Sequence, residues 1–234
     1  MIAVVLVGAT PKPIPIPNSS LISKKIDFSQ FEKICTYNEQ YNSYQCQQPL
    51  SEFHCDYFLK PSEHFAWLEP LLPVMTCRKT ETEGETSQEG VYRVHGVGWM
   101  FNKVYVTDYA VFSNGEFKLI NSADEFKNVF APVQTEKEAL AFVEALNKGN
   151  LVFDTQSLMS LEHGKYKVSK SIINKTSVSK TGEGFFVNVY TDSGPDTCEE
   201  TVYRKNLLVK TSGEIEEKDS VLIWESDRKP RCID

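Results

Sequence analysis

Residues 135–149 read TEKEALAFVEALNKG, and this stretch decides how the second half of the chain folds. Thr135 and Glu138 fit a capping box, in which a hydroxyl and a carboxylate satisfy two backbone N–H groups at a helix start. The apolar positions that follow repeat at helical spacing and form one stripe, flanked by alanines that allow close approach to a sheet: Leu140, Val143 and Leu146, with Ala139 and Ala145. Gly149 ends the predicted helix at about Lys148.

The sequence after this helix is almost entirely strand-like, because β-branched and aromatic runs alternate with Gly-containing or polar turns. The predicted strands are residues 151–153, 166–173, 185–190, 202–210 and 221–225. A helix followed by antiparallel strands buries its apolar stripe when the sheet curls across it. We therefore predict an α+β fold of antiparallel sheets and a few helices. Its second half is a helix followed by a curled four- to five-stranded meander, in cystatin-like order. That analogy concerns the fold alone, since such modules serve as inhibitors, scaffolds and enzymes.

Upstream of the helix, residues 91–120 also favour strands, with Asn114-Gly115 as a strong hairpin signal. A second capping box, Ser122 to Glu125, begins a short helix that stops before Pro132. Residues 80–90 carry four glutamates and almost no apolar side chain, which predicts a solvated acidic loop.

Residues 27–48 show apolar and aromatic side chains at spacings of three and four, which predicts a helix ended by Pro49. The stripe consists of Ile34, Tyr37, Tyr41 and Tyr44. Its tyrosines could grip a carbohydrate or a partner, but the half-buried face of an amphipathic helix is the commoner use. Trp99 follows two glycines, so it is either an exposed anchor for protein contact or a core tryptophan.

These features divide the chain into four segments. Residues 1–26 are an apolar stretch and a Pro-rich tether, and residues 27–79 are a helical and then irregular Cys-rich segment. The acidic loop over 80–90 separates them from an α+β domain over 91–234, which could form one domain with 27–79.

The six cysteines are even in number and include no C-x-x-C pair, which disfavours a zinc knuckle or a thioredoxin-like site. They are Cys35, Cys46, Cys55, Cys77, Cys198 and Cys232. We expect disulfides, and only Cys198–Cys232 is predicted as a specific pair, because these residues bracket an apparent hairpin. Six reduced, buried cysteines in a cytosolic protein are the alternative.

The first residues support export without deciding it. Residues 1–10 have the length of a signal-peptide core with small residues at Val7 and Ala9, but they lack a basic segment. A retained Val-rich strand is the competing interpretation. Residues 11–17 alternate prolines with other residues and predict an extended tether. The location expected from these features is secreted, periplasmic or on the cell surface.

Composition limits the classes of partner. The formal net charge of −7 has the wrong sign for a protein that binds a phosphate backbone, so no nucleic-acid partner is expected. No apolar run approaches the roughly 18 residues of a membrane-spanning helix. Two N-x-S/T sequons, at Asn18 and Asn174, are about what composition alone would give.

Catalytic motifs are weak. Ser177-Val-Ser-Lys180 and Lys180-Thr-Gly182 match motifs of penicillin-binding enzymes, but they overlap in one turn, which makes a shared catalytic role impossible. A thiolate–imidazole couple of Cys55 with a histidine requires a free thiol and competes with the disulfide prediction. The histidines considered are His54, His64 and His95, and a zinc set of Cys46, Cys55, His64 and Cys77 has unsuitable gaps.

The sequence therefore favours a non-enzymatic, exported binding or assembly protein that acts through protein–protein contacts, with no cofactor or metal. Two alternatives stay open. One is a small hydrolase or carrier of a hydrophobic ligand with a pocket in the curled sheet. The other is a subunit of a surface complex or filament, with residues 1–10 as a donated strand. The oligomeric state is not defined by the sequence.

Overall fold

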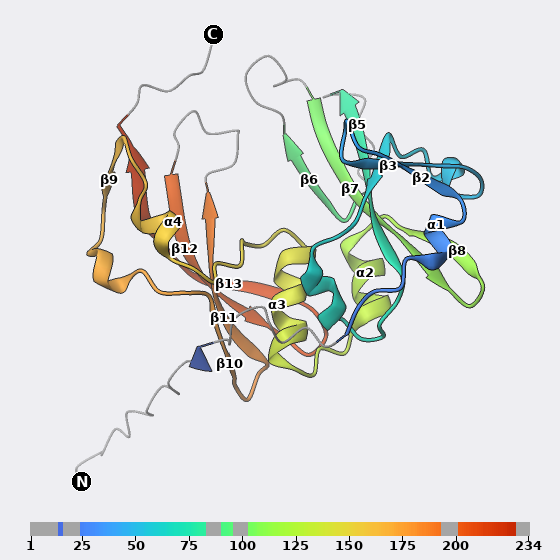
Figure 1. Ribbon diagram of the computed structural model, residues 1–234. Coiled ribbons are helices and arrows are strands. Elements are labelled where there is room, and N and C mark those ends of the chain that lie inside the picture. The colour runs from blue at the N-terminus through green and yellow to red at the C-terminus, as the bar shows by residue number, and fades with distance from the viewer. Residues whose placement is uncertain (1–13, 16–23, 83–89, 96–102, 193–200, 228–234) are drawn as a thin grey trace.

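The computed structural model describes residues 14–15, 24–82, 90–95, 103–192 and 201–227, which form two antiparallel sheets and four α-helices (Figure 1). Sheet A has the order β1-β10-β11-β12-β13-β9, and sheet B has the order β2-β3-β4-β5-β7-β6 with β8 paired to β7. The α+β class predicted from the sequence is confirmed.

The strands of sheet A are β1 (Ile14–Pro15), β9 (Gly164–Tyr166), β10 (Ser177–Lys180), β11 (Phe185–Asp192), β12 (Thr201–Val209) and β13 (Ile215–Ser226). The strands of sheet B are β2 (Cys35–Asn38), β3 (Ser43–Cys46), β4 (Tyr57–Leu59), β5 (Val74–Thr82), β6 (Tyr92–His95), β7 (Lys103–Ser113) and β8 (Glu116–Ile120). The helices are α1 (Ser29–Glu32), α2 (Ala123–Phe130), α3 (Glu136–Ala145) and α4 (Gln156–Met159), with short 3₁₀ turns η2 (Leu50–Phe53), η3 (Glu63–Trp67) and η5 (Lys170–Ile172).

The helix predicted to begin at Thr135 is α3, and it lies against sheet A as predicted. Thr135 Oγ1 accepts a hydrogen bond from Glu138 N at 3.2 Å, and Glu138 Oε2 accepts one from Thr135 N at 2.8 Å, which completes the capping box. The helix ends at Ala145, a little before the predicted end, and Asn147 takes a left-handed φ of 51°. It contacts β10, β11 and β12, the first three strands of the meander β10–β13.

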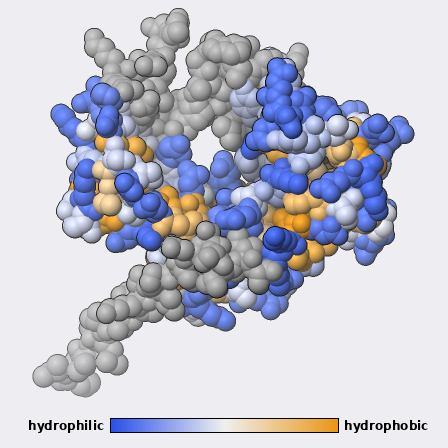
Figure 2. All heavy atoms as spheres, in the orientation of Figure 1, coloured by the Kyte–Doolittle hydropathy of each residue, from blue (hydrophilic) through white to orange (hydrophobic). Residues whose placement is uncertain are grey.

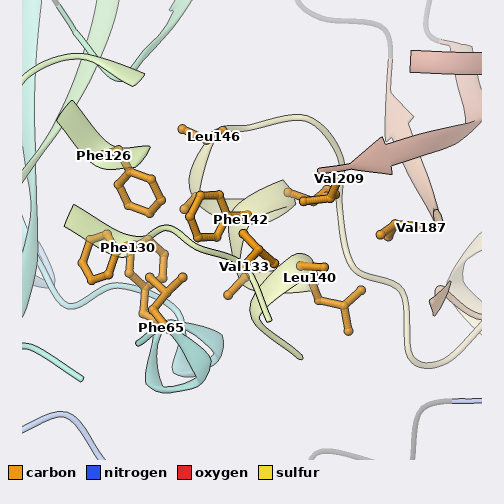
Figure 3. Packing of buried hydrophobic residues seen from close by; sticks show 14 of the residues in the cluster. Phe65, Phe126, Phe130, Val133, Leu140, Phe142, Leu146, Val187 and Val209 are labelled. Atoms are coloured by element: carbon orange, nitrogen blue, oxygen red, sulfur yellow. The ribbon is translucent and has the colours of Figure 1, made fainter. Parts of the chain in front are cut away.

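A single hydrophobic cluster fills the space between the two sheets (Figure 3). The side chains that it takes from α2 and α3 include Phe126, Phe130, Leu140 and Phe142, all with no more than 1% exposure. Phe65 and Val74 of the first third of the chain belong to the same cluster as Val187 and Val209 of sheet A. The two sheets therefore share one core.

The predicted hairpin at Asn114-Gly115 forms, and the predicted capping box at Ser122 forms in part. Asn114 and Gly115 connect β7 to β8 with φ values of 55° and 85°, as a type I′ turn requires. Ser122 Oγ accepts from Glu125 N at 3.2 Å, but the Glu125 carboxylate binds the N–H of Asn121, one residue earlier than in a full box. This helix, α2, ends at Phe130, before Pro132 as predicted.

The predicted helix over residues 27–48 is wrong. Only Ser29–Glu32 is helical, and Cys35–Cys46 is a hairpin made of β2 and β3. Strand pairing places Tyr37 opposite Tyr44 and Cys35 opposite Cys46, and the latter pair is a disulfide. A covalent bond across the strands and the β-propensity of Thr and Tyr outweigh the helical spacing.

Residues 151–153 and 166–173 were also predicted as strands, and that prediction is largely wrong. Strand β9 overlaps only the start of the second range, and the region carries α4 and η5. It packs on sheet A through a second cluster that includes Ile173, Tyr190, Ile223 and Trp224. Its apolar residues are therefore used for packing, not for pairing in a ladder.

The acidic loop begins later than predicted, because Thr80–Thr82 still belongs to β5. Several predictions lie outside the described residues: the apolar segment over 1–10, most of the loop over 80–90, Trp99, and the Cys198–Cys232 pair.

Candidate functional site

The most exposed aromatic side chains in the described part of the chain lie on the hairpin over residues 35–46, which we call the tyrosine hairpin. Tyr37 is 45% exposed and Tyr41 is 68% exposed. Its first strand, β2, is the edge strand of sheet B. Figure 2 shows hydrophobic residues reaching the surface among hydrophilic ones on the sheet B side, at the right of the view.

The tyrosines extend a buried cluster outward to solvent. Tyr44 pairs with the buried Phe58 on one side and with Tyr37 on the other, and the rings of Tyr37 and Tyr44 are 5.0 Å apart. Tyr37 Oη donates to Asn42 Oδ1 at 2.7 Å, and Lys60 Nζ lies 5.6 Å from the Tyr44 ring. The rings of Tyr37 and Tyr44 are therefore held in place by contacts within the protein.

The backbone of β2 points half of its polar groups away from the sheet. Gln47 N donates to Ile34 O at 2.9 Å, which marks this pair as hydrogen-bonded. Hydrogen-bonded and non-hydrogen-bonded residue pairs alternate along an antiparallel ladder. Cys35 and Tyr37, one and three positions after Ile34, therefore occupy non-hydrogen-bonded positions. Among the described residues β2 pairs only with β3, so the N–H and C=O groups of Cys35 and Tyr37 face the edge of sheet B, where an added strand can pair with them.

Two disulfides brace this half of the molecule, namely Cys35–Cys46 and Cys55–Cys77. The first closes the tyrosine hairpin, and the second joins the residues before β4 to the buried centre of β5. The predicted use of cysteines in disulfides is confirmed for these four. A nucleophilic Cys55 and a zinc set of Cys46, Cys55, His64 and Cys77 are wrong, because these three sulfurs are already bonded.

A polar cluster that the sequence analysis missed joins η3 to α3. Ser62 Oγ donates to Glu144 Oε2 at 2.7 Å, and His64 Nδ1 lies 2.9 Å from the same oxygen. His64 is 9% exposed, and its ring lies in tilted contact with Trp67 and Phe153 at centroid distances of 4.5 and 5.2 Å. Ser62 and Glu144 are 82 positions apart, so no local motif could indicate their meeting.

This cluster lacks the geometry of a serine nucleophile. A catalytic serine must give its proton to the imidazole, which the carboxylate orients from its other side. Here the Ser62 hydroxyl and the His64 ring bind the same carboxylate oxygen of Glu144, so the hydroxyl is directed at the acid. The contacts among these three residues join the η3 segment to α3.

A second feature not predicted is a buried ion pair on sheet B. Lys79 Nζ lies 2.8 Å from Asp108 Oδ2, and the Asp108 side chain is 1% exposed. The other oxygen, Asp108 Oδ1, is buried and has no hydrogen-bond partner among the described residues. Asp108 pairs with Cys77 in the ladder between β5 and β7, beside the second disulfide.

On sheet A, hydrogen bonds from Lys210 and Lys218 lower the pKa of Glu216 to about 2, and the same contact with Glu216 raises the pKa of Lys210 to about 12. A carboxyl whose pKa is lower in the folded state adds stability above its unfolded pKa near 4.5 and loses it toward pH 2. We therefore expect the urea midpoint of the parent to fall between pH 4.5 and 2 more steeply than that of Glu216→Gln.

The matched control for this pH dependence is Glu183→Gln, which removes an exposed carboxylate at the turn between β10 and β11. The urea midpoint of Glu183→Gln is expected to change with pH in the same way as the urea midpoint of the parent. Equal slopes for the parent and Glu216→Gln would contradict the ion pairing. A carboxyl titration by NMR provides a direct second measurement.

Within the described ranges, no three His, Cys, Asp or Glu side chains gather so as to hold a metal ion. None of the helices formed by those residues is both long and apolar enough to cross a membrane. Comparison of the chain with protein-family models, with curated proteins and with solved structures finds no match.

Proposed function

We propose that the protein is a non-enzymatic, exported binding protein that contacts another protein through the tyrosine hairpin. One observation carries this proposal. Tyr37 and Tyr41 are exposed on a hairpin whose edge strand, β2, directs the N–H and C=O groups of two residues away from the sheet, and a disulfide closes that hairpin. Tyrosine is enriched at protein interfaces, because it supplies a large contact area for the loss of few rotatable bonds.

The disulfides support the export of the chain. Such bonds persist in oxidising surroundings, including the secreted, periplasmic and cell-surface locations expected from the sequence. A hairpin of this length has little stability alone, and its covalent closure lowers the entropy lost when a partner binds.

An extended segment of the partner is the ligand that suits this edge. Its backbone would pair with the outward groups of Cys35 and Tyr37, as in recognition by strand addition. Its side chains on one face would then meet the rings of Tyr37 and Tyr44.

The packing of α3 weighs against a ligand carrier that uses the curled sheet. The residues of α3 that face sheet A have no exposed surface, including Leu140 and Val143. The helix fills the concave side of the sheet where a hydrophobic ligand would lie.

Photo-crosslinking tests the proposal. A benzophenone amino acid at position 41 is expected to link the protein to a partner in extracts of its native source, and Tyr37→Ala/Tyr41→Ala should weaken that binding at least tenfold, or by about 1.4 kcal/mol. The control places the same photoprobe at position 186, because Phe186 is an exposed aromatic residue of sheet A. Equal crosslinking from positions 41 and 186 would contradict the proposal.

A further inference from the structure

Asn174 stands on the surface between η5 and β10, in the sequence Asn174-Lys175-Thr176. This is an N-x-T sequon, the acceptor sequence for an N-linked glycan. Both Asn174 and Lys175 are exposed. The other sequon, at Asn18, lies outside the described residues.

The backbone of Asn174 is fixed while its side chain remains accessible. Its N–H donates to Tyr190 Oη at 3.1 Å, and the same hydroxyl donates to its carbonyl oxygen at 2.8 Å. The side-chain Nδ2 donates one hydrogen to Ile172 O at 3.2 Å. A primary amide carries two hydrogens, so the second can be replaced by a sugar without loss of this bond.

We propose that Asn174 is an N-glycosylation site whose modification takes place before the chain folds. In the transfer step, Asn174 Nδ2 forms a bond to the anomeric carbon of an oligosaccharide carried on a polyprenyl pyrophosphate. The bond from that carbon to the pyrophosphate oxygen breaks, and the lipid pyrophosphate leaves. The amide proton goes to a base of the transferase, and no oxidation or reduction is involved.

The order of events follows from Thr176. The transferase must reach the hydroxyl of the sequon, but Thr176 is 1% exposed in the folded protein. Its Oγ1 accepts a hydrogen bond from Val152 N at 2.8 Å, and its own N–H donates to Val152 O at 2.8 Å. The folded chain therefore presents the asparagine but conceals the threonine.

A glycan at Asn174 would also cover an apolar part of the surface. Ile172 is 38% exposed and Met159 is 39% exposed, which makes them two of the five large hydrophobic side chains exposed in the described residues. Lys170 Nζ donates to Met159 O at 2.7 Å and ties the two segments together. The first sugars would lie close to Ile172, which is two positions from Asn174, and would separate this side chain from other molecules.

The test supplies the chain with a cleavable secretion signal and translates it in the presence of endoplasmic-reticulum microsomes. We expect an endoglycosidase-sensitive mass increment on the peptide that contains Asn174, and its loss in Asn174→Gln. Lys175→Arg keeps the sequon and is expected to keep the increment. An unmodified Asn174 peptide in the parent would overturn the proposal, and this result does not depend on any partner of the tyrosine hairpin.

A second experiment tests the order of events. Purified, disulfide-closed protein and reduced, unfolded protein are each given microsomal transferase and a lipid-linked oligosaccharide. Only the unfolded chain is expected to gain the increment at Asn174. Equal modification of the folded protein would overturn the claim that Thr176 must be accessible first.

Discussion

Phe126→Ala will lower the free energy of unfolding by about 4 kcal/mol, because it removes the ring at the centre of the core shared by the two sheets. Phe126 has no exposed surface, and its ring lies 4.8 Å from Phe130, 5.3 Å from Phe142 and 5.4 Å from Tyr109, measured between centroids. These neighbours belong to α2, α3 and β7, so the cavity would open where three elements meet. Urea unfolding at neutral pH measures the change.

The matched control is Phe186→Ala on sheet A. Phe186 is 37% exposed, so the same truncation there is expected to change stability by less than about 1 kcal/mol. Phe126→Leu keeps most of the apolar volume and should cost about 1.5 kcal/mol. A loss below that value for Phe126→Ala would mean that the cluster is not packed as described.

Local signals made part of the second half of the fold predictable. The capping residues Thr135 and Ser122 mark helix starts through contacts within four residues, and Asn114-Gly115 marks a turn through its own backbone. The strands β11, β12 and β13 follow one another in a meander, so neighbours in sequence are neighbours in space. Short-range chemistry is enough to define such elements.

The tyrosine hairpin shows why the first third was mispredicted. Tyr37, Tyr41 and Tyr44 have a spacing that suits one helix face, and the same residues suit a hairpin in which Tyr37 and Tyr44 meet. The deciding contact is the disulfide between Cys35 and Cys46, and sequence alone leaves the pairing of six cysteines open. The tyrosines were identified as a possible contact surface for the wrong geometric reason.

Contacts between distant segments were not predictable. Ser62 and His64 meet Glu144 only after α3 packs on η3, and Lys79 meets Asp108 only when β5 pairs with β7. With 32 acidic residues in the chain, no pattern marks Glu144 and Asp108 as the carboxylates that meet these partners. Which of these polar residues come into contact depends on how distant segments of the chain pack together.

The ion pair of Lys79 and Asp108 lies on sheet B, which also carries the tyrosine hairpin. Lys79→Met is expected to lower the free energy of unfolding by about 3 kcal/mol. The reason is that the Asp108 side chain is 1% exposed and that its Oδ1 has no partner within the part of the chain that the structure describes. Without the ammonium group it would remain a buried charge with no compensating neighbour. Urea unfolding of the oxidised protein measures this change.

A double variant separates the cost of an unpaired charge from the cost of lost packing. Lys79→Met/Asp108→Leu removes both charges, so we expect it to regain most of the stability lost in Lys79→Met. Lys118→Met breaks an ion pair to Glu116 whose side chains are 54% and 62% exposed, and it should cost less than about 1 kcal/mol. If Lys79→Met were as mild as Lys118→Met, water must reach Asp108, and the carboxylate would not be the buried charge described above.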